Sequence, residues 1–475
     1  MKSIHKTIIV VLILPILASC SDWLDISPKS QIKVSDNYTN EQGFKDALTG
    51  VYLLMTKPAL YGRDLTYGLV DILGKQYTQV QSSSNYYYLS QYDYTNQYSL
   101  DIIDGVWAAA YNTIANINLL IDNIDKSDPA IFTANNRRLI KGEAYGLRAY
   151  LSFDLLRLFG YSMLAGEDEK AIPYVTTYGK ELTPFSTTKE TIEKILADID
   201  IAVNELKADP VYENREPMTD DESWTRNREL KLNYYAIKLL RARVNLYKGD
   251  YQSAMTDAQE VVDQSHFDWT PSSEITTTST ESRNRIFSQE MIFGLHVPSL
   301  KDDYDSWFTS PTGYYKSNYY WEQTFEVSLP GYSADYRFEY LTHFDPSAYI
   351  RYSTKLQQSE NVTESYSRKL PLMRLSEAYY ILSECKYRLS GVAEATPYLN
   401  FVRAKRNIMV ELSTTISGSQ FINELLKEHM KEFVSEGQLF FFYKRHNMSS
   451  INYHFSTILP ETYVLPIPLE ELANR

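Results

Sequence analysis

Residues 232–262 constrain the fold of this chain more than any other stretch, because they place two helical patterns around one glycine turn. Apolar residues recur at three- and four-residue steps from Leu232 to Leu246, which is the spacing of an amphipathic helix. Gly249 interrupts the pattern, and a second apolar stripe runs from Tyr251 to Val262. Glycine tolerates the positive φ that a tight turn between helices requires. The segment therefore predicts a hairpin of two packed helices.

The turn of this hairpin resembles that of a tetratricopeptide repeat, in which small residues let paired helices approach closely. A second hairpin pattern begins at Leu375, turns at Gly391 and returns through Val402, with a turn one residue shorter than the first. Repeats of this kind form arrays in which each helical pair packs on its neighbours. The two patterns lie far apart in the sequence, so we expect an interrupted array.

Further apolar stripes predict helices outside the two hairpins. They cover residues 44–55, 107–124, 140–158, 192–206 and 422–433. Thr39 with Gln42 and Thr187 with Glu190 form capping-box patterns before two of them, and Gly160 follows a third. Helices dominate the prediction, and the expected fold class is mostly α.

Two segments lack this periodicity and are rich in polar and aromatic residues. One covers residues 81–100, and the other covers residues 265–371 and contains six prolines. Long loops inside a compact protein are uncommon unless they bind something. We therefore expect both segments to contribute to a recognition surface on the helical scaffold.

The aromatic residues of these loops are suited to binding sugars. Tyrosine is the compositional outlier, with 40 residues against 19 phenylalanines and 6 tryptophans, and its ring combines an apolar face with a hydrogen-bonding tip. Sugar rings stack their C–H faces on such rings, while their hydroxyls bond to amides and carboxylates. The candidate ligand-binding residues are Asn85, Tyr86, Tyr87, Tyr88, Tyr92 and Tyr94 in the first loop and Trp307, Tyr314, Tyr315, Tyr320 and Trp321 in the second. The alternative is that individual rings pack the loops onto the scaffold.

Composition and motifs exclude several other classes of function. The net charge of −13 argues against a nucleic-acid-binding role, which needs a concentrated basic face. The sequence contains no HExxH spacing, no CxxC pair and no glycine-rich phosphate loop. We therefore expect no metal, nucleotide or other cofactor, and only a calcium ion in the loops stays open, because its oxygen ligands need no fixed spacing.

The first twenty residues read as an export signal that ends in a lipidation site. Lys2 and Lys6 precede an apolar run that Pro15 interrupts, and this run is shorter than the roughly 20 residues of a membrane-spanning helix. Leu-Ala-Ser-Cys at residues 17–20 resembles a bacterial lipobox, which implies removal of residues 1–19 and acylation of Cys20. The alternative is an ordinary signal peptide with a chance cysteine.

Several motifs in order along the chain resemble the SusD/RagB family of outer-membrane lipoproteins. These are Cys20 followed by Trp23-Leu24-Asp25, the run GEAYGLRAY at residues 142–150, and RLSEAYY at residues 374–380. The resemblance implies a SusD-like fold, in which tetratricopeptide-like helical hairpins support a loop-rich ligand-binding half. It also implies capture of an oligosaccharide at the cell surface and delivery to a SusC-like TonB-dependent transporter in the outer membrane. Gln438 and Leu439 depart from the family pattern, which usually has an arginine after Glu-Gly.

The polar residues of these motifs are better candidates for structure than for binding. Arg148, Arg374, Glu377 and Glu384 lie on predicted helices or at their starts, where buried charges are usually paired to hold neighbouring elements in register. Cys385 falls on an apolar stripe and is expected to be an inert core thiol.

We expect residues 20–475 to form a single domain. It would consist of an N-terminal helical part over 20–264, the loop-rich insertion over 265–371 and a C-terminal helical part over 372–475. The leading interpretation is a non-catalytic glycan-binding lipoprotein. A surface glycoside hydrolase and a scaffold or peptide-binding lipoprotein remain as alternatives.

Overall fold

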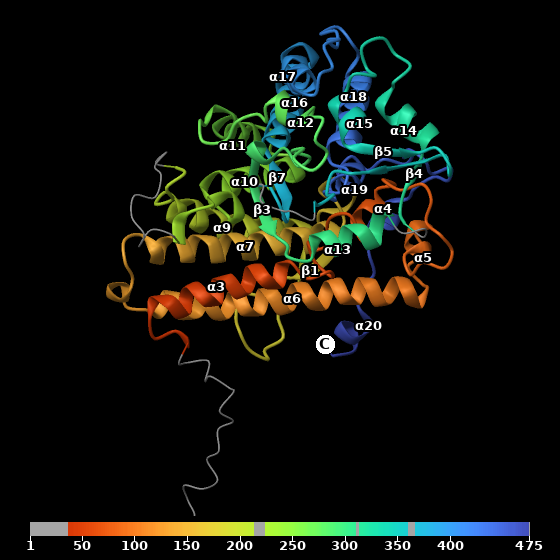
Figure 1. The fold of residues 1–475 in the computed structure, drawn as a ribbon. Coiled ribbons are helices and arrows are strands. Elements are labelled where there is room, and N and C mark those ends of the chain that lie inside the picture. The colour runs from red at the N-terminus through yellow and green to blue at the C-terminus, as the bar shows by residue number, and fades with distance from the viewer. Residues whose placement is uncertain (1–36, 213–223, 310–312, 360–365, 475) are drawn as a thin grey trace, which may run out of the picture.

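The helical part of the protein is an array of neighbouring helices. The structure is a computed structural model that describes residues 37–212, 224–309, 313–359 and 366–474. The predicted signal peptide and Cys20 lie outside the described residues. In the array α3 (Glu41–Met55) packs on α6 (Gln97–Lys126), α6 on α7 (Asn136–Phe159), and α7 on α9 (Thr188–Leu206) (Figure 1). The predicted mostly α fold class is confirmed.

Both predicted hairpins are present. The first is α10 (Tyr234–Lys248) with α11 (Tyr251–Asp263), and the second is α16 (Leu375–Ser390) with α17 (Val392–Lys405). Gly249 is left-handed with φ 87° and ψ 9°, whereas Gly391 has φ 95° and ψ 178°, so the two turns differ as expected. Helix α11 packs against α16, and the array that is interrupted in sequence is therefore continuous in space. The likeness of these hairpins to tetratricopeptide repeats remains a prediction.

Two details of the helix ends differ from the prediction. The first residue of the N-terminal capping motif is Asn40 and not Thr39, because the Asn40 side chain accepts a hydrogen bond from the Gly43 amide. Gly160 does end α7, but with φ −103°. A Cβ there would lie 2.8 Å from the Cβ of Ala171, so close packing and not backbone conformation favours glycine at this position.

The segment predicted as a loop-rich insertion contains short elements of its own. It is connected to the scaffold through β3 (Met291–His296) and β7 (Lys369–Arg374), which pair antiparallel. The other elements between α11 and β7 are α12 (Ser272–Ile275), α13 (Leu300–Tyr304), α14 (Asn318–Phe325), α15 (Tyr336–Tyr340), and a three-stranded sheet of β4 (Lys316–Ser317), β6 (Ile350–Ser353) and β5 (Thr342–Asp345). The sequence analysis missed this sheet because its strands are too short to show a period of two.

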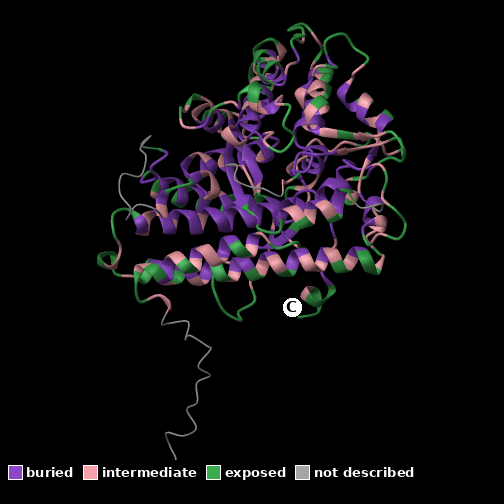
Figure 2. Cartoon of the chain, in the orientation of Figure 1, coloured by how far each residue is buried: buried purple, intermediate pink, exposed green. Residues whose placement is uncertain are grey.

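The remaining elements are short or lie near the C-terminus. They are α4 (Leu69–Leu73), α5 (Tyr87–Ser90), α8 (Met163–Gly166), β1 (Lys170–Pro173), β2 (Phe185–Thr187), α18 (Gly418–Glu432), α19 (Leu439–Arg445) and α20 (Leu469–Ala473). The predicted loop over 81–100 thus contains the one-turn helix α5, and its last residues belong to α6. One large core of buried apolar residues extends from Phe44 to Leu465, and α7 is buried along most of its length (Figure 2). No helix of the described residues is long and apolar enough to cross a membrane.

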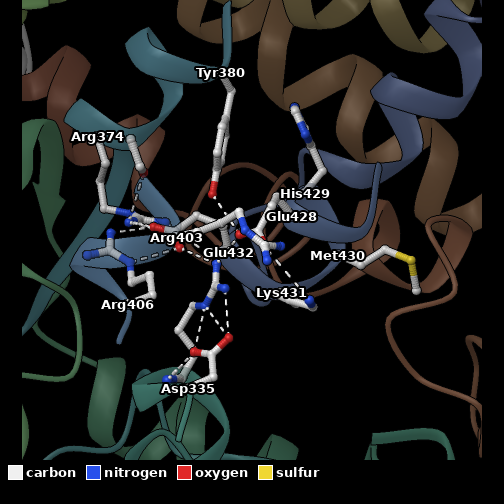
Figure 3. A network of polar contacts seen from close by, with 12 residues as sticks. Asp335, Arg374, Tyr380, Arg403, Arg406, Glu428, His429, Met430, Lys431 and Glu432 are labelled. Carbon is white, nitrogen blue, oxygen red and sulfur yellow. Dashed lines mark hydrogen bonds and ion pairs between the residues drawn. The ribbon is translucent and has the colours of Figure 1, made fainter. Parts of the chain in front are cut away.

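A buried network of charged side chains connects the insertion to the scaffold (Figure 3). At its centre the Glu432 carboxylate on α18 accepts hydrogen bonds from Arg374, from Arg406 at 2.6 and 3.0 Å, and from Arg337 at 2.9 Å. Arg337 belongs to α15 of the insertion, Arg374 ends β7, and Arg406 follows α17. All four side chains are at most 2% exposed. The network therefore determines how the loop-bearing insertion sits on the helices.

The other predicted structural residues are also paired and buried. Arg148 donates two hydrogen bonds to Asp198, at 2.6 and 2.7 Å. Glu377 pairs with Arg243, and Glu384 pairs with Arg445. These contacts confirm the structural interpretation. Cys385 is fully buried, and burial raises the pKa of its thiol to about 12, which agrees with an unreactive core residue.

Acid is expected to weaken the fold through His429 on α18. Its ring packs against Phe442 and Tyr380, and burial lowers its pKa from 6.5 to about 4. Between about pH 4 and pH 6.5 the unfolded chain therefore binds a proton on the His429 ring more tightly than the folded protein does. The free energy of unfolding should fall by up to about 3 kcal/mol as the pH drops through this window.

Urea unfolding at a series of pH values measures this effect. Replacement of His429 by glutamine should remove this part of the pH dependence, whereas the same change at the exposed His343 should leave it intact. Equal slopes in the wild type and the His429→Gln variant would contradict the assignment. The carboxylates of Glu428 and Glu432 have lowered pKa values, so their own contribution to the pH dependence begins near pH 4.5, and the slopes are compared above about pH 5.

Candidate functional site

The structure brings together the two aromatic segments that the sequence analysis selected. Ser84 and Tyr314 are 230 residues apart in the chain, yet their hydroxyls are hydrogen-bonded. The amides of Thr78 and Gln79 donate to the carbonyl of Tyr315 at 3.2 and 3.1 Å. The first loop and the insertion therefore form one surface, next to α4 and α5 in Figure 1.

Six rings form a cluster where these segments meet, which we call the aromatic cluster: Tyr67, Tyr77, Tyr86, Trp307, Phe308 and Tyr314. Tyr314 stacks on Trp307 with ring centroids 3.9 Å apart and planes 15° apart. Tyr86 meets the Trp307 ring edge-on at 5.1 Å. Trp307 is only 6% exposed, whereas Tyr314 is half-buried. In this arrangement Trp307 supports Tyr314, and Tyr314 is the ring with accessible surface.

A guanidinium and a carboxylate border the aromatic cluster. Arg63 lies 5.7 Å from the ring centre of Tyr86 and forms an ion pair with Asp64 at 3.2 Å. The hydroxyl of Tyr86 donates to Asp64 at 2.6 Å. Burial raises the pKa of Asp64 and the nearby guanidinium opposes this rise, while burial and the adjacent carboxylate raise the pKa of Tyr86. The Arg63 side chain is 35% exposed, so its remaining donors are accessible beside the rings.

Three predicted site residues of the first loop also have accessible surface. Asn85 is exposed, and Tyr87 and Tyr88 are half-buried, with their rings 5.4 Å apart. Tyr88 lies parallel to Tyr98, which is 53% exposed, at 6.4 Å. These side chains offer ring faces and an amide close to the aromatic cluster.

Other predicted site residues hold the loops in place. Trp321 is 3% exposed, lies against Phe325 and donates from its indole to the carbonyl of Arg351 at 2.7 Å. Tyr92 and Tyr94 donate from their hydroxyls to the carbonyls of Leu73 and Thr462. For these residues the structure shows anchoring contacts, and direct contact with a ligand remains a prediction. Tyr320 is half-buried and lies apart from the aromatic cluster, 4.7 Å from the ring of Tyr453.

The sequence analysis missed Arg63, Asp64, Tyr67 and Tyr77. They lie between two predicted helices in a stretch that has no periodicity. Arg63, Tyr67 and Tyr77 contact Trp307 or Phe308, more than 200 positions away, and Asp64 contacts Tyr86, 22 positions away. The run Tyr-Gly-Arg-Asp at residues 61–64 combines an aromatic, a turn glycine and two charges, and this composition was an available signal. Among the described residues, no group of three histidine, cysteine or acidic side chains could hold a metal ion.

Comparisons with known families identify the chain. A family model described as "Starch-binding associating with outer membrane" matches residues 22–224, and the SusD family model matches residues 251–463. The chain belongs to the SusD/RagB family. Both the resemblance seen in the sequence and the expected SusD-like fold are thereby confirmed.

The SusD/RagB relatives are distant in sequence. Two SusD-like proteins of Formosa agariphila are 24% and 23% identical over 274 and 268 residues, which cover 57% and 55% of this chain. The alignments span 47% and 46% of those proteins, so the chain matches just under half the length of these curated relatives.

Solved SusD structures match the fold over nearly the whole chain. A SusD superfamily protein from Bacteroides thetaiotaomicron has a TM-score of 0.71 at 20% identity, with 91% of this chain and 98% of that chain covered. Surface glycan-binding protein A from the same species, solved in complex with laminarihexaose, has a TM-score of 0.67 at 16% identity, covering 92% and 98%. At these identities the likeness shows a shared fold.

Proposed function

We propose that this protein is a non-catalytic oligosaccharide-binding lipoprotein of the outer membrane that passes its ligand to a SusC-like TonB-dependent transporter. The observation that carries this proposal is the aromatic cluster. It joins two distant loops and contains the half-buried ring of Tyr314. The partly exposed Arg63 borders the rings of Tyr86 and Trp307, and the exposed Asn85 precedes Tyr86 in the chain. Membership of the SusD/RagB family and the laminarihexaose complex of a structural neighbour support carbohydrate binding.

Each part of the candidate site would have a distinct task. The ring of Tyr314 would stack against the C–H face of a sugar, since Trp307 behind it keeps its plane fixed. Arg63 and Asn85 would hydrogen-bond to hydroxyls, and the ion pair with Asp64 holds Arg63 in position. Such a site binds through stacking and hydrogen bonds and needs no cofactor.

Lipidation at Cys20 and pairing with a transporter are proposed from the sequence and the family resemblance. A lipid at the first mature residue would tether the protein to the outer membrane. The loop surface could then present captured sugar to a neighbouring transporter.

Replacement of Tyr314 by alanine should weaken glycan binding about tenfold, because the loss of one stacking ring removes about 1.5 kcal/mol. Affinity electrophoresis of the protein against starch, laminarin, xylan, mannan and pectin provides the first measurement. Arg63→Ala should weaken binding to the same glycan. Isothermal titration calorimetry then quantifies both changes.

Tyr178→Ala is the matched control, since Tyr178 is 56% exposed and lies on the connection between β1 and β2. It should bind as the wild type does. Retardation that is unchanged in Tyr314→Ala would refute the site. Release of new reducing ends during incubation with the bound glycan would refute the non-catalytic role.

A further inference from the structure

The loop between α19 and the short turn Pro460–Tyr463 presents a phenylalanine that is almost fully exposed. Phe455 is 95% exposed, more than any other large apolar residue in the described part of the chain. Single exposed apolar residues are common on protein surfaces. The surroundings of Phe455 distinguish it, because this loop is anchored on both sides of the exposed ring.

The anchors of the loop are buried side chains and hydrogen bonds. Ile451 and Ile458 are 5% and 3% exposed, and the amide of Ile458 donates to the carbonyl of Ser449 at 2.9 Å. The hydroxyl of Tyr453 donates to the carbonyl of Tyr320 at 3.1 Å and bonds to the hydroxyl of Thr324. The loop is therefore closed at its base and tied to α14. Phe455 lies between these attachments.

Phe455 belongs to a group of six aromatic rings that we call the aromatic row: Tyr319, Tyr320, Tyr453, His454, Phe455 and Tyr92. It enters this group as the chain neighbour of His454. The ring centres of Tyr319 and Tyr320 are 5.4 Å apart, and those of Tyr320 and Tyr453 are 4.7 Å apart. His454 meets Tyr92 edge-on at 5.2 Å. Tyr319 is 59% exposed and Phe455 is 95% exposed, whereas the other four rings of the row are half-buried.

The aromatic row is continuous along the chain with the candidate glycan site. Tyr314 of the aromatic cluster is followed by the two-residue strand β4, and Tyr319 and Tyr320 begin the helix after it. Tyr86 of the cluster is followed by α5, and Tyr92 lies just beyond that helix. Two short elements thus lead from the cluster to the row.

We propose that the aromatic row is a second carbohydrate subsite that extends the candidate site, so that the protein selects extended oligosaccharides over short ones. This inference rests on the proposed function. The composition of the row favours a sugar chain over a protein partner, because its accessible rings alternate with tyrosine hydroxyls, an imidazole and the exposed Asn452. The buried centre of a protein interface is usually more apolar than this set of side chains.

The test compares long and short ligands. Phe455→Ala, Phe455→Ala/Tyr319→Ala and the Tyr178→Ala control are titrated with laminarihexaose and laminaritriose, and run on gels containing starch, laminarin, xylan, mannan or pectin. Oligosaccharides of matching lengths from the polysaccharide that retards the wild type are titrated in the same way. We expect the double variant to bind the long ligand about tenfold more weakly, with less than about a twofold change for the short one. Phe455 is so exposed that its removal should leave the fold intact.

The other outcomes separate this proposal from the proposed function. Equal affinity of the wild type and the double variant for the long ligand, with binding lost in Tyr314→Ala, overturns the second subsite and leaves the glycan site in place. Unchanged glycan binding with loss of co-purification of an outer-membrane transporter assigns Phe455 to a protein contact. Absence of wild-type binding to every glycan overturns both proposals.

Discussion

Replacement of Glu432 by glutamine is expected to destabilise the folded protein by about 3–5 kcal/mol, the usual cost of removing one partner from a buried ion pair. Its carboxylate accepts hydrogen bonds from Arg374, Arg406 and Arg337, and all of these side chains are buried. Glutamine has nearly the same shape but carries no charge, and its amide nitrogen would face a guanidinium donor. Three buried cations would lose a shared counter-charge.

Chemical denaturation followed by circular dichroism measures this loss. Glu193→Gln on α9 is the matched control, because Glu193 is exposed and the same chemical change there should shift the free energy of unfolding by less than about 0.5 kcal/mol. A Glu432→Gln midpoint equal to that of the control would show that the network contributes little. We also expect weaker glycan binding, because Arg337 connects the insertion to the scaffold.

Replacement of Gly437 by alanine should cost about 3 kcal/mol, from two effects that add. Gly437 has φ +66°, a left-handed conformation that disfavours alanine. A Cβ at this position would also lie 2.5 Å from the carbonyl oxygen of Leu65, which is backbone and cannot turn aside. The segment around Leu65 would have to move, and it carries Arg63 and Tyr67 of the candidate site.

Gly249→Ala separates the two effects. Gly249 is also left-handed, with φ +87°, but no atom lies within 4 Å of its added Cβ, so its substitution should cost only about 1 kcal/mol. Thermal unfolding of both variants gives the difference, and titration with the bound glycan shows whether Gly437→Ala alone loses affinity. Equal destabilisation of the two variants would mean that the Leu65 segment shifts at no cost.

The sequence by itself was sufficient for the helical scaffold and the family. The stripes that predict α6, α7, α10, α11, α16 and α17 are local, because a helix repeats every few residues and its buried face can be read from a short window. The structural interpretation of Arg148, Arg374, Glu377 and Glu384 also followed locally, since charges on helices that are otherwise apolar must be paired when buried.

Only the tertiary structure decided which aromatic residues meet and which of them have accessible faces. The sequence analysis treated Trp307 and Tyr314 alike, yet packing buries the first behind the second. Arg63 was absent from the prediction because the rings that it borders, those of Tyr86 and Trp307, are not its neighbours in the chain. Phe455 was absent because its exposure cannot be read from a local pattern. Loop conformation depends on long-range contacts such as those of Glu432 and Tyr453, and these leave no periodic signal. The sequence therefore determined that aromatic loops sit on a helical scaffold, while the packing of distant segments determined the surface that they form.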